Sequence, residues 1–111
     1  MDGQGPIGAE DLKQMELRAH SAAELLRAMA HPARLMILCN LAGPQRNVND
    51  LCAAVSMPQA QMSQQLARLR QDGLVTSRRA GREMFYRIAS AQTESLILTM
   101  YELFCAEVET R

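Results

Sequence analysis

Residues 48–87 decide the fold of this chain; they read VNDLCAAVSMPQAQMSQQLARLRQDGLVTSRRAGREMFYR. The stretch opens with apolar residues at helical spacing and breaks at Ser56-Met57-Pro58. A helix rich in glutamine follows, and Gly73 ends it. Residues 74–79 and 83–88 then read as two strands that meet at a basic tip, Arg78-Arg79-Ala80-Gly81-Arg82. This order predicts a helix-turn-helix followed by a wing.

Apolar spacing defines the two helices of that unit. Asn47 is a suitable N-cap for the first helix. Its apolar stripe consists of Val48, Leu51, Cys52 and Val55. Pro58 opens the second helix. Its inward positions are Met62, Leu66 and Leu69, and its outer face consists of Gln61, Gln64, Gln65 and Arg68. The outer face is therefore available to a ligand.

Further helices flank this unit on both sides. An N-terminal helix carries one narrow seam of Leu12, Met15, Ala19, Ala22, Leu26 and Met29. Residues 33–42, which follow Pro32, are apolar almost all round, so we expect this helix to be buried. A last helix over residues 93–107 has two apolar stripes. They consist of Leu96, Met100 and Leu103, and of Leu98, Tyr101, Cys105 and Val108.

The terminal helices predict a dimer. The seam of the N-terminal helix can pack onto the domain's own core or onto a second chain. Taken together, the apolar faces of two long terminal helices around so small a core favour a symmetric homodimer. The predicted interface residues are Leu12, Met15, Leu26, Leu96, Met100 and Leu103. We therefore predict a mainly α-helical, homodimeric winged helix-turn-helix with a two-stranded β wing. Residues 1–9 are expected to be disordered, and residues 10–111 are expected to form one domain with terminal dimerisation helices.

Composition limits the classes of protein that need to be considered. With 111 residues, 48% of them apolar and 4% aromatic, the chain suits one mainly helical domain. It has no run near the ~20 apolar residues that cross a bilayer, and no secretory signal at its start. We therefore expect a cytoplasmic protein without a membrane partner, in which the three cysteines are reduced thiols, metal ligands or sensors. The eight methionines are interpreted as core residues, and no cofactor is indicated.

Charge is unevenly distributed along a chain whose formal net charge is +0. Residues 58–88 hold six arginines against Asp72 and Glu83, a net charge of +4, whereas residues 89–111 carry four glutamates against one arginine, a net charge of −3. Such a split attracts a polyanion to one face only. Glutamine amides pair with adenine in the major groove, and arginine forks suit phosphate. The predicted DNA-binding residues are Gln59, Gln61, Ser63, Gln64, Arg68, Arg78, Arg79 and Arg82. From these residues alone, a winged helix that binds protein instead of DNA stays open as the alternative.

The chain resembles the ArsR/SmtB family of winged-helix repressors over residues 25–104. Three runs carry the resemblance. They are Ala30-His31-Pro32-Ala33-Arg34-Leu35, the run QAQMSQQLARLR at 59–70 with DGLV at 72–75, and Phe85-Tyr86-Arg87-Ile88. The resemblance implies a homodimer that binds an inverted-repeat operator in double-stranded DNA, represses transcription, and releases the operator when an inducer is sensed.

The metal sites common in that family are not matched. Metal-sensing members often carry a Cys-Val-Cys-Asp-Leu-Cys run in the third helix, where two thiolates hold a soft metal. Here asparagine replaces both members of that pair, at Asn47 and Asn49. Another common site needs ligands on the last helix, but His20 and His31 lie far upstream. We therefore predict no metal site, and we interpret Cys52 as a small buried hydrophobic residue.

Cys39 and Cys105 resemble the thiol pair of the persulfide-sensing branch of the family, which the ending Tyr101-Glu102-Leu103-Phe104-Cys105 strengthens. The resemblance implies that low-molecular-weight persulfides are the inducer and link the two thiols through a polysulfide bridge. By themselves the residues favour inert thiols, because Cys39 lies late in an apolar helix and Cys105 lies among glutamates.

Two other functions use the same cysteines. A metal or metalloid sensor with Cys39, Cys52 or Cys105 in an unfamiliar site stays open. A dithiol oxidoreductase would need a Cys-x-x-Cys run and a nearby base, and this chain has neither. We therefore predict that the chain is not an enzyme.

Overall fold

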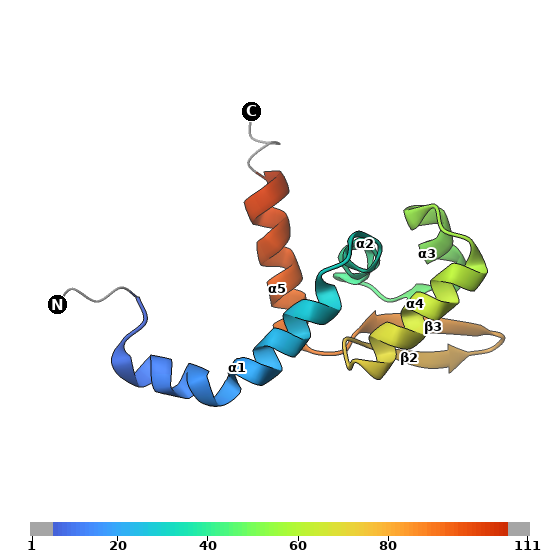
Figure 1. Cartoon of the computed structure of the whole chain (residues 1–111). Coiled ribbons are helices and arrows are strands. Elements are labelled where there is room, and N and C mark those ends of the chain that lie inside the picture. Colours follow the sequence, from blue (N-terminus) through green and yellow to red (C-terminus); the bar gives the residue numbers. More distant parts are fainter. Residues whose placement is uncertain (1–5, 107–111) are drawn as a thin grey trace.

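The computed structural model describes residues 6–106 and confirms a mainly helical winged helix-turn-helix. The elements, in chain order, are α1 (Ala9–Met29), α2 (Pro32–Leu41), β1 (Arg46–Asn47), α3 (Val48–Val55), α4 (Gln59–Gln71), β2 (Val75–Ala80), β3 (Glu83–Ile88) and α5 (Ala91–Tyr101), which continues as the π-helical segment η1 (Glu102–Ala106). Helices α2, α3 and α4 gather beside the hairpin of β2 and β3, while α1 and α5 extend away from them (Figure 1). Within the described residues, no helix is long and apolar enough to cross a membrane.

One apolar core joins the central helices to the sheet. Its buried members are Met29, Ile37, Leu38, Leu41, Leu51, Met57, Met62, Leu66, Leu69, Leu74, Val75, Ile88 and Ile97. The three inward positions predicted for α4 are all fully buried. Helix α2 is buried along Ile37, Leu38 and Leu41, but Met36 on the same helix is 50% exposed. The sequence predicted that this helix would be buried, but in the single chain it is not buried all round.

The wing belongs to a three-stranded antiparallel sheet with the order β1-β3-β2. The predicted hairpin is present, and Gly81 turns its tip in the left-handed region, with φ at +64°. The sequence did not predict β1, in which Arg46 pairs with Tyr86 and Asn47 pairs with Phe85. Two residues are too few to show the alternating pattern that marks a strand.

Side-chain caps set where the helices begin. Asn47 Oδ1 accepts a hydrogen bond from the backbone N–H of Asp50 at 2.7 Å, which confirms the predicted cap of α3. Ser90 Oγ accepts in the same way from Thr93 N–H at 3.1 Å. Because Ser90 supplies this cap, α5 begins at Ala91, before the predicted start at residue 93.

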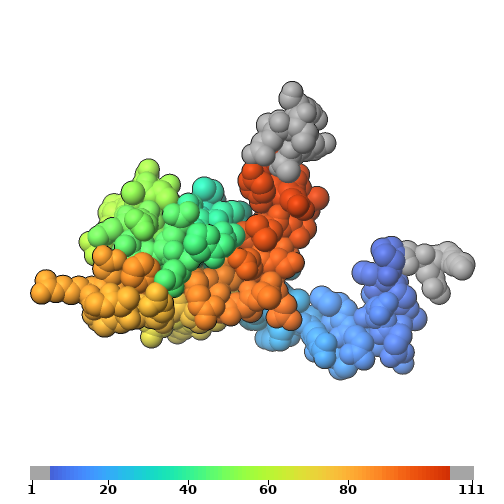
Figure 2. Space-filling view, turned by 180° about the vertical axis from the view of Figure 1, so that it is seen from behind, coloured from blue at the N-terminus to red at the C-terminus, as the bar shows by residue number. Residues whose placement is uncertain are grey.

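The terminal helices expose much of their apolar surface. Of the predicted interface residues, Leu12, Met15, Leu26 and Leu103 are at least half exposed, whereas Leu96 and Met100 pack partly against the core. Phe104, which we had not assigned to an interface, is 73% exposed. Both terminal helices lie at the end of the molecule opposite the tip of the wing (Figure 2). Residues 1–5 and Val108 lie outside the described residues.

Candidate DNA interface and thiol pair

A tight turn sets the angle between α3 and α4. Ser56 takes the left-handed conformation, with φ at 56° and ψ at 53°, and Met57 N–H donates to Cys52 C=O at 3.1 Å. Met57 is buried, and Pro58 then starts a new helix because its ring cannot continue the old one. The side chain of Met57 anchors the turn in the core, so α4 has a fixed direction.

Helix α4 presents its polar residues to solvent. Gln59, Gln61, Ser63 and Gln64 in its first turns are all exposed, and Gln65 is half-buried. Met62 and Leu66 hold the opposite face in the core, which turns this polar face towards solvent. A recognition helix places its base-reading side chains in the same first turns.

A groove joins the start of α4 to the tip of the wing. It has a volume of about 200 Å³ and is lined by Asn47, Val48, Asn49, Gln59, Arg82, Glu83 and Met84. Two predicted DNA-binding residues, Gln59 and Arg82, therefore share one concave surface although they are far apart in sequence. The sequence had given no reason to place Asn49 or Glu83 here, and no local sequence signal marks them.

The three arginines of the wing differ in their surroundings. Arg78 Nε donates to Gln45 Oε1 at 3.0 Å, and its guanidinium carbon lies 5.3 Å from the centre of the Phe85 ring. Arg78 therefore helps to hold the wing against the segment that precedes β1. Arg79 and Arg82 are exposed near the tip, where a hairpin reaches DNA backbone or minor groove.

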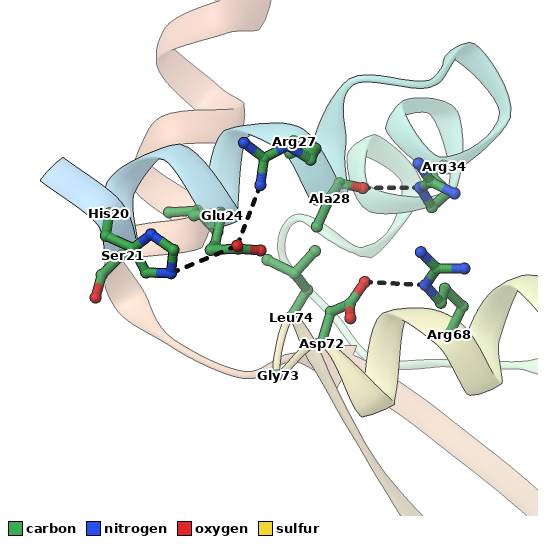
Figure 3. Close-up of a pocket in the computed structure, with 11 residues that line it drawn as sticks. His20, Ser21, Glu24, Arg27, Ala28, Arg34, Arg68, Asp72, Gly73 and Leu74 are labelled. Carbon is green, nitrogen blue, oxygen red and sulfur yellow. Dashed lines mark hydrogen bonds and ion pairs between the residues drawn. The ribbon is translucent and has the colours of Figure 1, made fainter.

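Arg68 lies at the other end of α4, about 14 Å along the helix axis from Gln59. Its Nε is 3.4 Å from the Asp72 carboxylate, and it lines a groove of about 380 Å³ between α1, α2 and the end of α4 (Figure 3). Across this groove Arg34 Nε donates to Ala28 C=O at 2.8 Å and ties α2 to the end of α1. Arg68 is thus separated from the residues that line the groove between the start of α4 and the tip of the wing.

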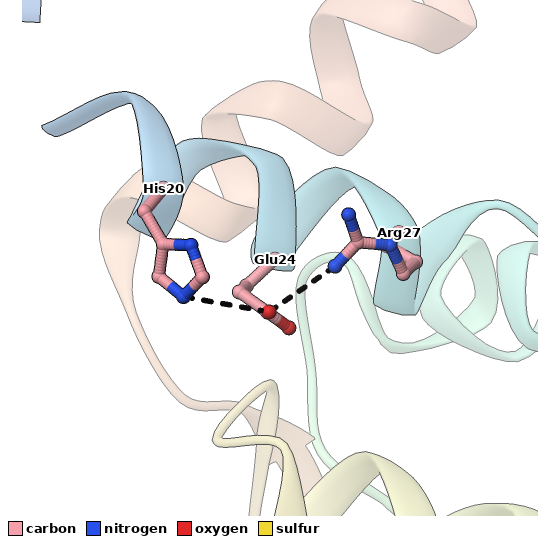
Figure 4. Close-up of polar contacts among 3 residues, drawn as sticks. All are labelled: His20, Glu24 and Arg27. Atoms are coloured by element: carbon pink, nitrogen blue, oxygen red, sulfur yellow. Dashed lines mark ion pairs between the residues drawn. The ribbon is translucent and has the colours of Figure 1, made fainter. Parts of the chain in front are cut away.

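An ion-pair cluster lines the same groove on the side of α1. Glu24 lies 3.6 Å from His20 Nε2 and 3.1 Å from Arg27 Nη1 (Figure 4). All three side chains are well exposed, so these pairs contribute little to the stability of the fold.

The two predicted sensing thiols interact electrostatically. Cys39 on α2 is half-buried, and Cys105 on η1 is exposed. Burial raises the pKa of the Cys39 thiol, and repulsion from Cys105 raises it further. Cys39 also lies beside Ile97 and Leu98 of α5, the helix that continues through η1 to Cys105, although the two cysteines are far apart in sequence. The raised pKa agrees with the expectation that nothing near Cys39 favours its thiolate.

The space beside Cys39 is apolar. A cavity of about 220 Å³ there is lined by Cys39, Ala42, Ile97, Leu98 and Tyr101. Cys52, which we interpreted as a small buried hydrophobic residue, packs against the core from α3 and is half-buried. Over residues 6–106 no group of three His, Cys, Asp or Glu side chains is placed to hold a metal ion.

These features together define a class: a winged helix-turn-helix protein of the kind that binds DNA and regulates transcription. Comparison with known proteins gives the family. Residues 31–77 match the model described as bacterial regulatory protein, arsR family. A biofilm growth-associated repressor of Agrobacterium fabrum is 44% identical over 103 residues, which is 93% of this chain and 88% of that protein. The chain belongs to the ArsR family of DNA-binding transcriptional regulators, and these relatives are not enzymes, as predicted.

Solved structures agree with this assignment. The transcriptional repressor BigR from Xylella fastidiosa superposes with a TM-score of 0.79 at 38% identity, covering 84% of this chain and 95% of that one. A homodimeric winged helix-turn-helix DNA-binding domain from Mycobacterium bovis gives a TM-score of 0.73 at 28% identity, covering 100% of this chain and 96% of that one.

The pKa of Cys39 generates a prediction. A raised thiol pKa means that less thiolate is present at a given pH, so Cys39 should react with iodoacetamide more slowly than an unperturbed thiol at the same pH. Cys105→Ser removes the repulsion but leaves the burial, so the rate profile of Cys39 should move to lower pH without reaching that of a free thiol. Peptide mass spectrometry across a pH series measures this rate. An unchanged profile would show that the two thiols do not interact.

Proposed function

We propose that this protein is a homodimeric, cytoplasmic repressor that binds an inverted-repeat operator and releases it when low-molecular-weight persulfides bridge Cys39 and Cys105. The observation that supports the sensing part is the apolar cavity that Cys39 shares with Ile97 and Leu98 of α5, the helix that continues through η1 to Cys105. The proposal needs no cofactor, because the two thiols would themselves hold the sulfur.

The surface around α4 supports the DNA-binding part. A major groove admits one helix, and Gln61 and Gln64 are exposed on α4, where their amides would pair with base edges. The groove between the start of α4 and the tip of the wing would then contact the sugar-phosphate backbone, with Gln59 on one side and Arg82 on the other. We assign base reading to Gln59, Gln61, Ser63 and Gln64, and phosphate contacts to Arg68, Arg78, Arg79 and Arg82.

The apolar terminal helices support the dimer. A cavity of about 500 Å³ between them is almost wholly apolar and is lined by Leu26, Met29, Ala30, His31, Pro32, Leu35 and Met100. Together with exposed Leu103 and Phe104, it forms an apolar surface of the kind that marks protein–protein interaction sites. A second copy of this chain is the occupant we propose, and the homodimeric relative from Mycobacterium bovis supports it.

The proposed sulfur chemistry starts at the exposed thiol. Cys105 would take up one sulfur atom from a persulfide RSSH, giving a Cys105 persulfide and the thiol RSH. Cys39 reacts later, because it is half-buried and its raised pKa lowers the fraction of thiolate at a given pH. A second RSSH accepts the two electrons, so that the Cys105 persulfide, the Cys39 thiol and RSSH give a trisulfide bridge, RSH and hydrogen sulfide. Inserted sulfur also joins thiols that are too far apart for a direct disulfide.

Hydrogen bonds near Cys39 offer a route from the bridge to the wing. Arg46 Nε on β1 donates to Asn40 C=O at 2.6 Å, next to Cys39. Glu94 on α5 accepts from Gly43 N–H at 2.8 Å, just before β1. A bridge that shifts α5 against α2 would therefore act on the strand that pairs with the wing. A hundredfold loss of operator affinity needs only ~2.7 kcal/mol of coupling.

DNA titrations test the interface. On an operator selected from a random duplex library, Gln61→Ala should cost about 1–3 kcal/mol, and it should cost nothing on random DNA. Arg82→Ala should weaken binding to every duplex and flatten the salt slope by ~0.9 for each lost phosphate contact. Exposed Gln71 at the end of α4 provides a matched control, because Gln71→Ala should bind like the parent. Equal losses on both duplexes for Gln61→Ala would remove Gln61 from the base-reading set.

Sedimentation velocity tests the dimer. Leu26→Glu combined with Leu103→Glu places two charges on the proposed interface, where each would be buried without a partner, so monomers should form. Both side chains are at least half exposed in the single chain, so the helical far-UV spectrum should survive. Leu17→Glu is the control, because Leu17 lies off the apolar seam of α1 and is 79% exposed. A folded dimer carrying both charges would place the interface elsewhere.

Intact mass and operator binding together test the switch. Glutathione persulfide should add at least one sulfur atom across the pair and release the operator. Cys39→Ser and Cys105→Ser should stay bound, and Cys52→Ser should respond like the parent. Release of the Cys105→Ser protein by persulfide would contradict the bridge. Release of the parent by stoichiometric Zn²⁺ would support the metal sensor in its place.

A further inference from the structure

The pairing of β1 with the wing stops short of the tip. Strand β1 pairs with β3 only at Tyr86 and Phe85. Beyond Phe85, towards the tip, Met84 and Glu83 pair only with β2. This outer part of the wing is a two-stranded ribbon, and such a ribbon is marginally stable in water. The tip that carries Arg82 therefore needs another restraint if it is to hold one position.

The side chain of Asn47 supplies a restraint at this point. Asn47 Nδ2 donates to Glu83 Oε1 at 2.8 Å, while Oδ1 of the same amide caps α3 through Asp50 N–H at 2.7 Å. One amide group thus connects the first turn of α3 to the first residue of β3. Since Arg82 directly precedes Glu83, the link restrains the backbone next to the tip.

The charge of Glu83 favours a structural reason for its presence. Residues 58–88 carry six arginines and only two acidic residues, Asp72 and Glu83. A carboxylate next to the tip repels DNA phosphate, so electrostatics alone disfavours an acid at this position. Asp72 is paired with Arg68, and Glu83 is held by Asn47. Glu83 also lines the groove with Gln59 and Arg82, where its charge would face the backbone of bound DNA.

We propose that Asn47 and Glu83 are positioning residues for DNA binding, and that their hydrogen bond holds the wing so that Arg82 meets the phosphate backbone without a further ordering cost. The inference rests on the proposed contact between Arg82 and DNA. Preorganisation of this kind increases affinity because fewer degrees of freedom are lost on binding.

Two substitutions at Glu83 with the same change of charge test the link. The probe is a mixed-sequence duplex of about 30 base pairs, long enough for two half-sites one helical turn apart. Glu83→Gln removes the charge but keeps an oxygen that accepts from Asn47, so it should bind this duplex at least as tightly as the parent. Glu83→Ala removes both, and it should bind about fivefold more weakly than Glu83→Gln, the effect of one hydrogen bond. If Glu83 acted only through its negative charge, both variants would bind equally and more tightly than the parent.

A second pair of measurements asks whether the link acts through Arg82. Asn47→Ser keeps an oxygen that caps α3, but its hydroxyl is too short to reach Glu83. It should weaken binding about fivefold in the parent and less than twofold in the Arg82→Ala background, because the residue it positions is then absent. Thermal unfolding followed by circular dichroism should give similar midpoints for all variants, which separates positioning from loss of fold.

The outcomes separate this inference from the proposed function. If Arg82→Ala weakens binding but Glu83→Ala equals Glu83→Gln, the wing contact stands and the positioning role fails. If Asn47→Ser costs the same in both backgrounds, the pair does not act through Arg82 and the proposal is overturned. If Arg82→Ala leaves the affinity unchanged, the proposed wing contact fails, and the positioning role fails with it.

Discussion

Burial of one stripe of α4 is the constraint on which the rest of the structure depends. Met62, Leu66 and Leu69 are fully buried in the core that α2, α3 and the sheet also build. Each such side chain contributes about 1.5–3 kcal/mol by leaving water, so the helix cannot rotate about its axis without a large loss. Because one face is fixed inward, the glutamine face is fixed outward. The surface that we assign to DNA is thus a direct consequence of core packing.

The terminal helices also carry apolar side chains, but many of these side chains remain exposed to solvent. The single chain covers only part of their apolar surface: Ile97 is buried in the core, whereas Leu103 and Phe104 stay exposed. This incompleteness links the proposed dimer to the proposed switch, because Cys105 lies on the same C-terminal segment. A change that moves this segment against α2 would alter both the surface offered to a partner and the surroundings of Cys39.

For the proposed DNA binding, the local distribution of charge matters more than the net charge of the chain. The formal net charge is +0, yet both acidic residues between positions 58 and 88 are engaged by neighbours, Asp72 by Arg68 and Glu83 by Asn47. Near the wing this leaves Arg79 and Arg82 exposed at the tip, while Arg78 is held by Gln45 and the Phe85 ring. The family assignment identifies the chain as a DNA-binding regulator. It agrees with this local arrangement of arginines, because the whole sequence has no excess of basic residues.

The sequence by itself determined the order of helices and hairpin, the cap at Asn47 and the inward stripe of α4, because these depend on spacing and on neighbours a few residues away. It also predicted Cys39 and Cys105 as sensing thiols, but only through a family resemblance. Tertiary structure alone decided strand β1, the groove shared by Gln59 and Arg82, and the bonds of Glu83 and Glu94, whose partners lie 36 and 51 positions away. Such contacts carry no periodic signal in the chain. They exist only because core packing brings distant segments together.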